Sequence, residues 1–516
     1  LLKYLIIILS KNSMKKIKPT FSLFSRFLDY VEIIGNKLPH PATLFAFLAF
    51  LVVILSWIGA TYNLTAIHPA DGSVITAKSL LDGDGLRWMY VNLVENFVKF
   101  PPLGIVLAIM VGIGAAEGSG LITALIRTLV LSAPKSLITF SIVFAGVISH
   151  TASEAGYVVL IPLGAAIFYA LGRHPMAGLA AAFVGVSGGF GANFIVTSID
   201  PVLSGLSQSA ATIIDSSITI SPAVNLYFSF ISGILIVIGG TFITEKIVEP
   251  RLGKYEGNAE KIELKNVTKT EKSGLIWAGI SFLALMVLVA ILTIPEGALL
   301  RNPKTGSVLH SAFMDGMSTL IMLAFLIPGI VYGYVTGSIR SDKSLMKFIV
   351  NSMNHMGAYI VLVFFAAQFV YFFIYSNLGI ILAINGAHFL KEIGLTGIPL
   401  IIGFVLLSAF INMFMGSASA KWAIMAPVFI PMLMLLGYHP GLTQAAFRIG
   451  DSLTNIITPM MSYFALIVTF AQKYDEKNGI GTIISTMLPY TLILTVLWSL
   501  LLVAWMLIGL PLGPDG

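Results

Sequence analysis

Residues 446–468 read AFRIGDSLTNIITPMMSYFALIV, an apolar stretch that is long enough to cross a bilayer yet is repeatedly interrupted. The interrupting residues are Arg448, Asp451, Asn455, Thr458 and Pro459. Charged side chains in membrane segments are costly and usually mark a functional site, and proline breaks the helical hydrogen-bond ladder. The stretch therefore indicates a broken membrane helix with a polar site at its break.

The composition of the whole chain predicts a membrane protein with many spans. Of its 516 residues, 57% are hydrophobic and only 10% are charged, against roughly 25% charged residues in soluble proteins. The net charge of +6 comes from basic residues in short polar segments rather than on one continuous face, so we expect no nucleic-acid partner. The absence of cysteine excludes disulfides and thiolate metal sites. We therefore expect an all-α polytopic fold surrounded by membrane lipid.

A long charged segment divides the chain into two halves. We expect a cytoplasmic N-terminal segment over 1–40, a first transmembrane half over 41–245, a charged cytoplasmic linker over 246–273 and a second transmembrane half over 274–510. The lysines and arginines before residue 40 predict a cytoplasmic N-terminus, because positive charge sets orientation. Residues 1–13 precede Met14, and we interpret them as translated upstream sequence that is not native.

Each half contains the same two irregular features in the same order. The first half has HTASEAGYVVLIPLG at 150–164 and ANFIVTSIDP at 192–201, and the second has GSASAKWAIMAPVFIP at 416–431 and TNIITP at 454–459. The uneven lengths of the apolar runs leave room for re-entrant hairpins near 150–172 and 414–436. Paired interruptions in two halves are the best sequence pointer to a secondary transporter with inverted-repeat halves and broken helices.

The breaks free backbone carbonyls beside polar side chains. Pro201 and Pro459 lack an N–H, and freed carbonyls are tolerated in a membrane only where they line a cavity or meet another group. Side-chain oxygens that suit a sodium ion lie at Asn193, Asn455, Asp451 and Thr458. We therefore expect either a sodium site at Asn193, Asn455 and Asp451 or, in the simpler alternative, proline kinks with packed polar residues.

Three ionisable residues are the strongest candidates for function. Arg448 can hold a carboxylate in a forked contact, whereas Asp200 and Asp451 can bind a cation or carry a proton. Arg448 and Asp451 are three residues apart, so they share a helix face and can instead form a structural ion pair.

The expected hairpins contribute a second group of candidates. The hydroxyls of Ser417 and Ser419 can donate to a carboxylate, although small residues also allow plain close packing. Trp422 can stack on an aromatic ligand or be an ordinary buried tryptophan. Lys421 and Glu154 occupy equivalent hairpin positions and are candidate functional residues as charged groups within apolar segments. The simpler expectation is that both face water at a membrane surface.

Other functional classes find little support. No phosphate-binding glycine-rich loop is present, which argues against an ATP-driven pump. The histidines lack metal-ligand spacing and no nucleophile–base order is evident, so we expect no enzyme. A channel remains an alternative, but paired breaks suit alternating access better.

At this point the residues resemble a known family. The segments GVISHTASEAGYVVLIPLGA, GGFGANFIVTSIDPVLSG, NMFMGSASAKWAIMAPVFIPM and RIGDSLTNIITPMMSYFALI are similar to the AbgT family of p-aminobenzoyl-glutamate transporters. The resemblance runs from about residue 23 to residue 510, and only residues 1–13 fall outside it.

The resemblance implies a fold of the ion-transporter superfamily. Its members are homodimers in the bacterial inner membrane, with about nine spans and two re-entrant hairpins per protomer. The family's functional positions fall here on Asp200, Asn412, Ser419, Trp422, Pro440, Arg448, Asp451 and Pro459. In the family picture the aspartates and Asn412 line a cation or proton path, Trp422 and Arg448 face the substrate, and the prolines shape broken helices. No cofactor is implied other than sodium or a proton as coupling ion.

The resemblance leaves the direction of transport open. The family is named for p-aminobenzoyl-glutamate, an aromatic compound with two carboxylates. Some members look like proton-driven exporters of sulfonamides, which mimic p-aminobenzoate. An arginine and a tryptophan suit either ligand, so uptake and efflux remain alternatives.

Overall fold

The computed structural model describes residues 41–67, 72–152, 156–257, 267–308, 311–354 and 356–514. The expected N-terminal segment 1–40 lies outside these residues, as do Ser153 and Glu154 of the first expected hairpin. The described chain is almost entirely helical, apart from an antiparallel ribbon of β1 (Thr65–Ile67) and β2 (Val74–Thr76). The expected all-α fold is confirmed.

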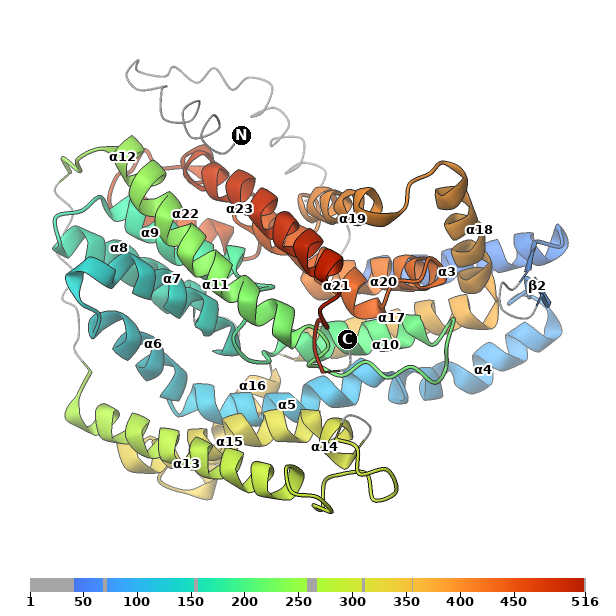
Figure 1. Ribbon diagram of the computed structural model, residues 1–516, viewed down its shortest axis with the longest axis horizontal. Coiled ribbons are helices and arrows are strands. Elements are labelled where there is room, and N and C mark those ends of the chain that lie inside the picture. Colours follow the sequence, from blue (N-terminus) through green and yellow to red (C-terminus); the bar gives the residue numbers. More distant parts are fainter. Residues whose placement is uncertain are drawn as a thin grey trace.

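The helices are labelled as in Figure 1. In the first half they are α3 (Pro41–Thr61), α4 (Gly83–Val98), α5 (Pro101–Gly118), α6 (Leu121–Leu131), α7 (Ile138–Ile148), α8 (Ile161–Ala170), α9 (Pro175–Phe183), α10 (Ile199–Ala211), α11 (Leu226–Ile243) and α12 (Glu249–Leu252). In the second half they are α13 (Lys269–Thr293), α14 (Ala312–Asp315), α15 (Met317–Thr336), α16 (Asp342–Asn354), α17 (Gly357–Tyr375), α18 (Leu378–Glu392), α19 (Gly397–Asn412), α20 (Ala418–Leu435), α21 (Pro440–Asn455), α22 (Phe464–Gln472) and α23 (Ile480–Ile508). Short 3₁₀ turns are η1 (Lys135–Leu137) and η2 (Ser149–Ala152), and π-helical turns are η3 (Gly156–Leu160), η4 (Val184–Gly188) and η5 (Thr244–Val248).

The lengths of these helices fit a protein that crosses a membrane many times. Among the described residues, eight helices are long and apolar enough to span a bilayer, and a ninth span results if α6 and the segment Lys135–Ile148 count as one. These two pieces are bent by 112° relative to each other. Helix α13 leaves apolar side chains such as Ile276, Leu283 and Val287 exposed, as expected where lipid is the solvent.

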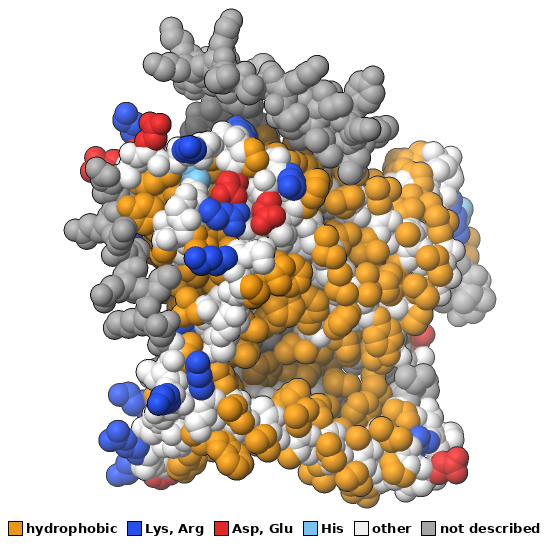
Figure 2. Space-filling view, turned by 60° about the vertical axis from the view of Figure 1, so that its left-hand side comes forward, with side chains coloured by type: hydrophobic (Ala, Val, Ile, Leu, Met, Phe, Trp, Pro, Cys, Tyr) orange, Lys and Arg blue, Asp and Glu red, His pale blue; other side chains and the backbone are white. Residues whose placement is uncertain are grey.

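The helices form a main body and a peripheral layer (Figure 1). The layer consists of α13 and α15, and α15 packs along α5. Small residues allow this contact, because a Cβ atom at Gly112 would lie 2.1 Å from the Met322 carbonyl oxygen. At Gly329 an added Cβ would lie 2.7 Å from Ala116 Cα. Figure 2 shows a broad apolar surface on the body and the layer, hollowed between them.

The body contains an internal repeat that is visible at residue level. The chain reads LGRHP at 171–175 and LGYHP at 436–440, in each case at the junction of two helices, α8 with α9 and α20 with α21. Both glycines adopt positive φ, as the end of a helix requires, and both prolines occupy the first turn of the next helix. Nδ1 of His174 accepts from the Met176 N–H at 3.3 Å, and Nδ1 of His439 accepts from the Gly441 N–H at 3.1 Å. Helices α9 and α21 thus begin in the same way, and both end at a break.

Two expected boundaries need correction. The charged linker is shorter than 246–273, because the helix of α11 continues through η5 and α12 to Leu252 and α13 begins at Lys269. The capping box formed by Thr268 and Glu271 fixes that second boundary. The expected hairpin range 150–172 contains η3 and α8 and the range 414–436 contains α20, and helices α7 and α19 precede them.

Candidate functional site

The candidate site lies where the broken helices of the two halves meet. In the first half, residues 189–198 lead irregularly from η4 to α10, and in the second half, residues 456–463 lead from α21 to α22. The Gly191 N–H donates to Ser452 Oγ at 2.7 Å and so joins the first break to α21. A Cβ atom at Gly191 would lie 2.7 Å from that oxygen and 2.9 Å from Arg448 Cβ. This close approach therefore requires glycine.

Arg448 on α21 pairs with Asp200 on α10 and so connects the two halves. Its Nη1 donates to Asp200 Oδ1, and its Nε donates to the Gly191 carbonyl at 3.2 Å. The other carboxylate oxygen, Asp200 Oδ2, accepts from the Thr197 N–H at 2.6 Å and from the Thr197 hydroxyl at 2.8 Å. Both charged side chains are buried, so each supplies the compensation that the other needs.

Asn193 lies beside the same arginine. With its amide oriented to satisfy its neighbours, Asn193 donates to the Ala192 carbonyl at 3.1 Å and its oxygen accepts from Arg448 Nη2 at 3.2 Å. Three groups of the first half, Asn193, Gly191 and Asp200, therefore surround one guanidinium of the second half. The forked shape of arginine suits this arrangement.

Lys421 on α20 forms a second buried ion pair, with Asp451 on α21. The ammonium also donates to Asn412 Oδ1 on α19. Lys421 is 1% exposed, so the expectation that it faces water is wrong. Asp451 therefore pairs with Lys421 while Arg448 pairs with Asp200, and the alternative in which Arg448 and Asp451 pair with each other does not occur in this structure.

Asn412 contacts the end of α21, just before the second break. Its Nδ2 lies 2.8 Å from the Asp451 carbonyl, from Thr454 Oγ1 and from Asn455 Oδ1. An amide has only two N–H bonds, so these acceptors share its hydrogens. Thr458 Oγ1 donates to the Met413 carbonyl at 3.0 Å, which ties the break itself to the end of α19.

Trp422 is fully buried and holds α20 against α10. Its Nε1 donates towards the Leu203 carbonyl at 3.1 Å and Ser207 Oγ at 3.0 Å, and its ring lies 4.5 Å from that of Phe447. Ser207 donates in turn to Gln444 Oε1 at 2.6 Å. In this conformation the tryptophan packs against protein, and a ligand reaches its ring only after these helices separate.

Ser419 lies one turn before Trp422 on α20 and is half-buried. Its Oγ is 3.3 Å from Ser417 Oγ, and it lines a small cavity together with Val202, Leu206 and Tyr359. Ser419 is thus a polar group beside an apolar space between α10, α17 and α20.

The three prolines begin or follow helices rather than interrupt them. Pro440 is the first residue of α21, and Pro201 lies in the first turn of α10. The N–H groups of a first helical turn have no intrahelical acceptor, so proline is tolerated there. Pro459 follows α21 and lies in the second break.

The oxygen atoms expected to hold sodium face nitrogen donors. Asn193 contacts Arg448, Asn455 Oδ1 accepts from Asn412, and Asp451 pairs with Lys421. Among the described residues, no cluster of acidic or histidine side chains of the kind that holds a metal ion is found. The residues therefore do not fit a sodium ion in this arrangement, because an ammonium already occupies the carboxylate.

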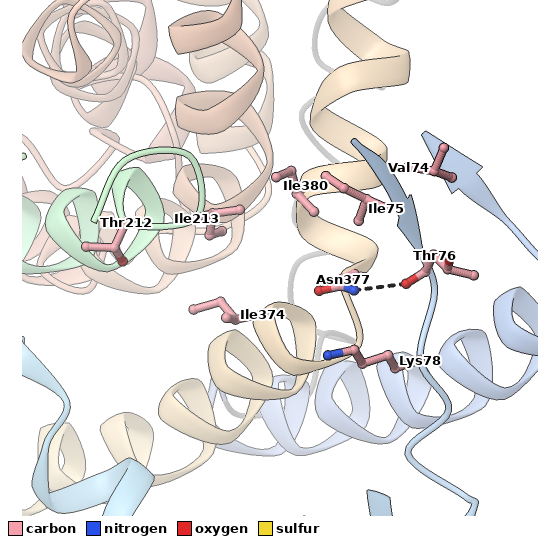
Figure 3. A pocket seen from close by; sticks show the side chains of 9 residues that line it. All are labelled: Val74, Ile75, Thr76, Lys78, Thr212, Ile213, Ile374, Asn377 and Ile380. Atoms are coloured by element: carbon pink, nitrogen blue, oxygen red, sulfur yellow. Dashed lines mark hydrogen bonds between the residues drawn. The ribbon is translucent and has the colours of Figure 1, made fainter. Parts of the chain in front are cut away.

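A larger pocket opens at the far end of α10 (Figure 3). It has a volume of about 500 Å³ and is lined by residues of β2, α17 and α18, by Thr212 and Ile213 just after α10, and by Lys78 and Asn377. Asn377 donates to the Thr76 carbonyl at 2.9 Å across its wall. Thr212 follows Asp200 by twelve residues along α10 and its cap, which is roughly 18 Å, so this pocket is distinct from the site around Asp200 and Arg448.

The sequence identified Asp200, Arg448 and Asp451 as candidates but did not predict which of them pair. Lys421 was also a candidate, as a lysine within an apolar segment is, but a position at a membrane surface was preferred for it. Gly191 and Ser452 escaped notice because only the folded chain brings them together. The repeated LGxHP segment was a stronger sign of the repeat than the serine-rich pairs, since both copies begin a broken helix.

Comparisons with known proteins agree on one family. The model of the AbgT putative transporter family matches residues 26–516. The p-aminobenzoyl-glutamate transport protein of Escherichia coli (strain K12) is 40% identical over 496 residues, which cover 96% of this chain and 97% of that protein.

Two solved structures have the same fold. The YdaH transporter of Alcanivorax borkumensis is 45% identical with a TM-score of 0.88, covering 92% of this chain and 100% of that one. MtrF of Neisseria gonorrhoeae, described as illuminating a class of antimetabolite efflux pumps, is 49% identical with a TM-score of 0.88, covering 93% of this chain and 97% of its own.

Proposed function

The chain belongs to the AbgT putative transporter family, and from that premise we propose that it is a secondary active transporter for p-aminobenzoyl-glutamate. The observation that carries this proposal is the crossing of two broken helices around the buried pair of Arg448 and Asp200. Such crossings are where secondary transporters bind substrate and coupling ion. The substrate is moved without covalent change, so the protein is not an enzyme.

The substrate has chemistry that matches the crossing. Arg448 binds one of its carboxylates once Asp200 releases the guanidinium, and Ser419 and Asn412 supply polar contacts nearby. Trp422 faces the aromatic ring when α20 moves away from α10. Each of these assignments requires the helices to part, because Trp422 and Asn412 are fully buried here.

A proton is the coupling ion that the described residues favour. Both acids at the crossing, Asp200 and Asp451, are paired with basic side chains, and a proton can replace a basic partner where a sodium ion finds no free oxygen cluster. Asn193, Asn455 and Thr458 then position backbone and base rather than bind metal. Sodium coupling is the alternative that a transport assay with separate gradients distinguishes.

Export of sulfonamides is the second candidate function. It is favoured by the 49% identity to MtrF, which is described with antimetabolite efflux pumps. A sulfonamide lacks the two carboxylates of p-aminobenzoyl-glutamate, so it makes less use of the basic residues. The two functions therefore predict different responses to loss of positive charge.

We propose a bacterial inner membrane location, with a cytoplasmic N-terminus and a homodimeric assembly. Helix α12 carries Arg251, the turns near it carry Arg173 and Lys473, and Figure 2 shows Lys and Arg side chains at this end with Asp and Glu among them. Arg251 donates to Ser485 Oγ at 2.7 Å, which places the start of α23 at the same end. Positive charge of this kind marks a cytoplasmic face. Cross-linking in native membranes tests the dimer, and cysteine labelling from each side tests the orientation.

Transport into proteoliposomes tests the proposed function. The purified protein is reconstituted, and labelled p-aminobenzoyl-glutamate or a labelled sulfonamide is supplied with proton and sodium gradients imposed separately. We expect p-aminobenzoyl-glutamate to move only under the proton gradient and Arg448→Gln to abolish that movement. Arg173→Gln, which alters an ion pair with Glu249 away from the crossing, is the matched control. Absence of transport by the folded native protein under either gradient contradicts the proposal.

A further inference from the structure

We propose that Lys421 is a second binding group for a substrate carboxylate. Asp451 pairs with Lys421 until the carboxylate of Asp451 takes up a proton. This inference rests on the proposed function, since it assigns the second carboxylate of p-aminobenzoyl-glutamate. It extends that function to a lysine that the sequence motifs alone do not connect with the substrate.

The surroundings of Lys421 carry the argument. Its side chain is fully buried in the fourth position of α20, and its ammonium contacts Asp451 and Asn412. Burying an ion pair seldom stabilises a protein more than apolar packing would at the same place. A buried pair between a lysine near the start of α20 and an aspartate near the end of the broken helix α21 is therefore better explained by a binding role than by stability.

The two buried bases are arranged alike. Arg448 on α21 is held by Asp200, and Lys421 on α20 is held by Asp451. Arg448 and Asp451 are three residues apart on one helix, so their side chains are neighbours on its surface. The two bases therefore lie at one stretch of α21. The two carboxylates of a glutamyl group lie at opposite ends of one short chain, which is why we assign one carboxylate to each base.

The exchange conserves buried charge. A proton from water binds an Asp451 carboxylate oxygen, the Lys421–Asp451 ion pair breaks, and the substrate carboxylate becomes the new counter-ion of the ammonium. Before the step the crossing holds one cation and one anion at this place, and afterwards it holds the same number. One proton and one carboxylate therefore enter together, which avoids an unpaired charge in an apolar interior.

The charged groups around Asp451 are few among the described residues. Helix α20 presents Lys421 to Asp451, α21 carries Arg448 one turn before it, and α19 presents the uncharged Asn412. Asp200 of α10 and the titratable His150 of η2 interact with Arg448. Asp200 is engaged by Arg448, and the contacts of Asp451 are with Lys421 and Asn412. Protonation of Asp451 therefore acts first on Lys421.

A simpler role for Lys421 is to clamp α20 to α21 whatever the ligand. The two roles differ in ligand dependence. An anchor for the second carboxylate affects p-aminobenzoyl-glutamate but not p-aminobenzoate, which has one carboxylate. A clamp affects both ligands equally.

Binding to the purified full-length protein separates these roles. Dissociation constants are measured for p-aminobenzoyl-glutamate and p-aminobenzoate with the native protein, Lys421→Gln and Lys421→Arg. We expect Lys421→Gln to weaken p-aminobenzoyl-glutamate binding by about 10- to 100-fold, as for loss of one charged contact, and to change p-aminobenzoate binding by less than about 2-fold. Lys421→Arg restores most of the loss, and Arg173→Gln changes neither constant.

A second variant keeps the test valid if Lys421→Gln does not fold. Lys421→Gln combined with Asp451→Asn removes both buried charges, so it folds and shows the same selective loss. Proton uptake on ligand binding, measured in weak buffer, is also smaller in this double variant than in the native protein. Equal weakening of both ligands, or unchanged proton uptake, overturns the inference. Failure of the folded native protein to bind p-aminobenzoyl-glutamate overturns the proposed function itself.

Discussion

The two breaks resemble each other in sequence but are held in different ways. The first, residues 189–198, is hydrogen-bonded to the opposite half, because Arg448 and Ser452 of α21 contact Gly191. Arg448 also pairs with Asp200, which follows this break. The second, residues 456–463, makes a polar contact within its own half, where Thr458 donates to the Met413 carbonyl of α19, and meets the first half through stacked rings, since Tyr463 lies on Tyr157 with centroids 4.7 Å apart.

This difference assigns different tasks to the two ion pairs. The pair of Arg448 and Asp200 links the halves, so its opening allows the broken helices to move relative to each other. The pair of Lys421 and Asp451 links a hairpin helix to a broken helix of the same half, so its opening frees one side of the site. The first pair thus controls how the two halves move relative to each other, and the second controls access to the site between them.

Among the changes that test this comparison, loss of Arg448 is expected to have the largest effect on stability and transport. Arg448→Gln leaves Asp200 buried without its cation, which costs about 3–5 kcal/mol of folding free energy and abolishes transport. Denaturation in detergent and proteoliposome transport measure the two effects. Combining it with Asp200→Asn recovers most of the stability but none of the transport, and recovery of transport contradicts a substrate role for the arginine.

The second break is probed by Asn412→Ala. This change removes the amide that Lys421, Thr454 and Asn455 share, at about 1 kcal/mol for each hydrogen bond lost, or roughly 2–4 kcal/mol in all. Thermal denaturation measures the loss, and substitution of the half-buried Asn92, whose amide donates to the Trp88 carbonyl of its own helix, is the control. If both changes have equal effects, the second break does not depend on α19.

Gly191→Ala tests how tightly the halves approach. The added methyl group would lie 2.7 Å from Ser452 Oγ, so we expect a loss of about 1–3 kcal/mol and slower transport. Gly403→Ala in α19 has no atom within 4 Å of its new methyl group and is expected to stabilise its helix slightly. Equal melting temperatures for the two variants would show that the halves leave room for a side chain at Gly191.

Thr458→Val has the smallest expected effect. It removes one hydroxyl that donates to the Met413 carbonyl, at about 1 kcal/mol, and leaves the shape of the side chain unchanged. Thr469→Val, which loses only a hydrogen bond to the Ala465 carbonyl of its own exposed helix, is the matched control with a smaller shift in melting temperature.

The sequence predicted the class of fold because composition and hydrophobic length are enough for that purpose. It also predicted two broken helices, since proline inside an apolar run frees backbone carbonyls that the neighbouring asparagine and threonine side chains can help to satisfy. It did not set the membrane depth of α7 and α19, because both are apolar and carry no mark that distinguishes a hairpin arm from a span.

The pairing of charges could not be predicted in the same way. Three-residue spacing on one helix made Arg448 and Asp451 plausible partners, but Asp200 and Lys421 are brought closer by contacts between α10, α20 and α21. Such contacts depend on long-range packing rather than on local periodicity. Lys421 is the clearest example. Its neighbours in sequence are apolar and predict burial, whereas its charge suggests an exposed position.

A double-mutant cycle tests the central claim that Arg448 serves the opposite half rather than its neighbour on α21. Arg448→Gln is combined in turn with Asp200→Asn and with Asp451→Asn, and the free energy of unfolding is measured for all variants. We expect a coupling energy of about 1–3 kcal/mol between Arg448 and Asp200 and less than about 0.5 kcal/mol between Arg448 and Asp451. Strong coupling to Asp451 with none to Asp200 would contradict the account.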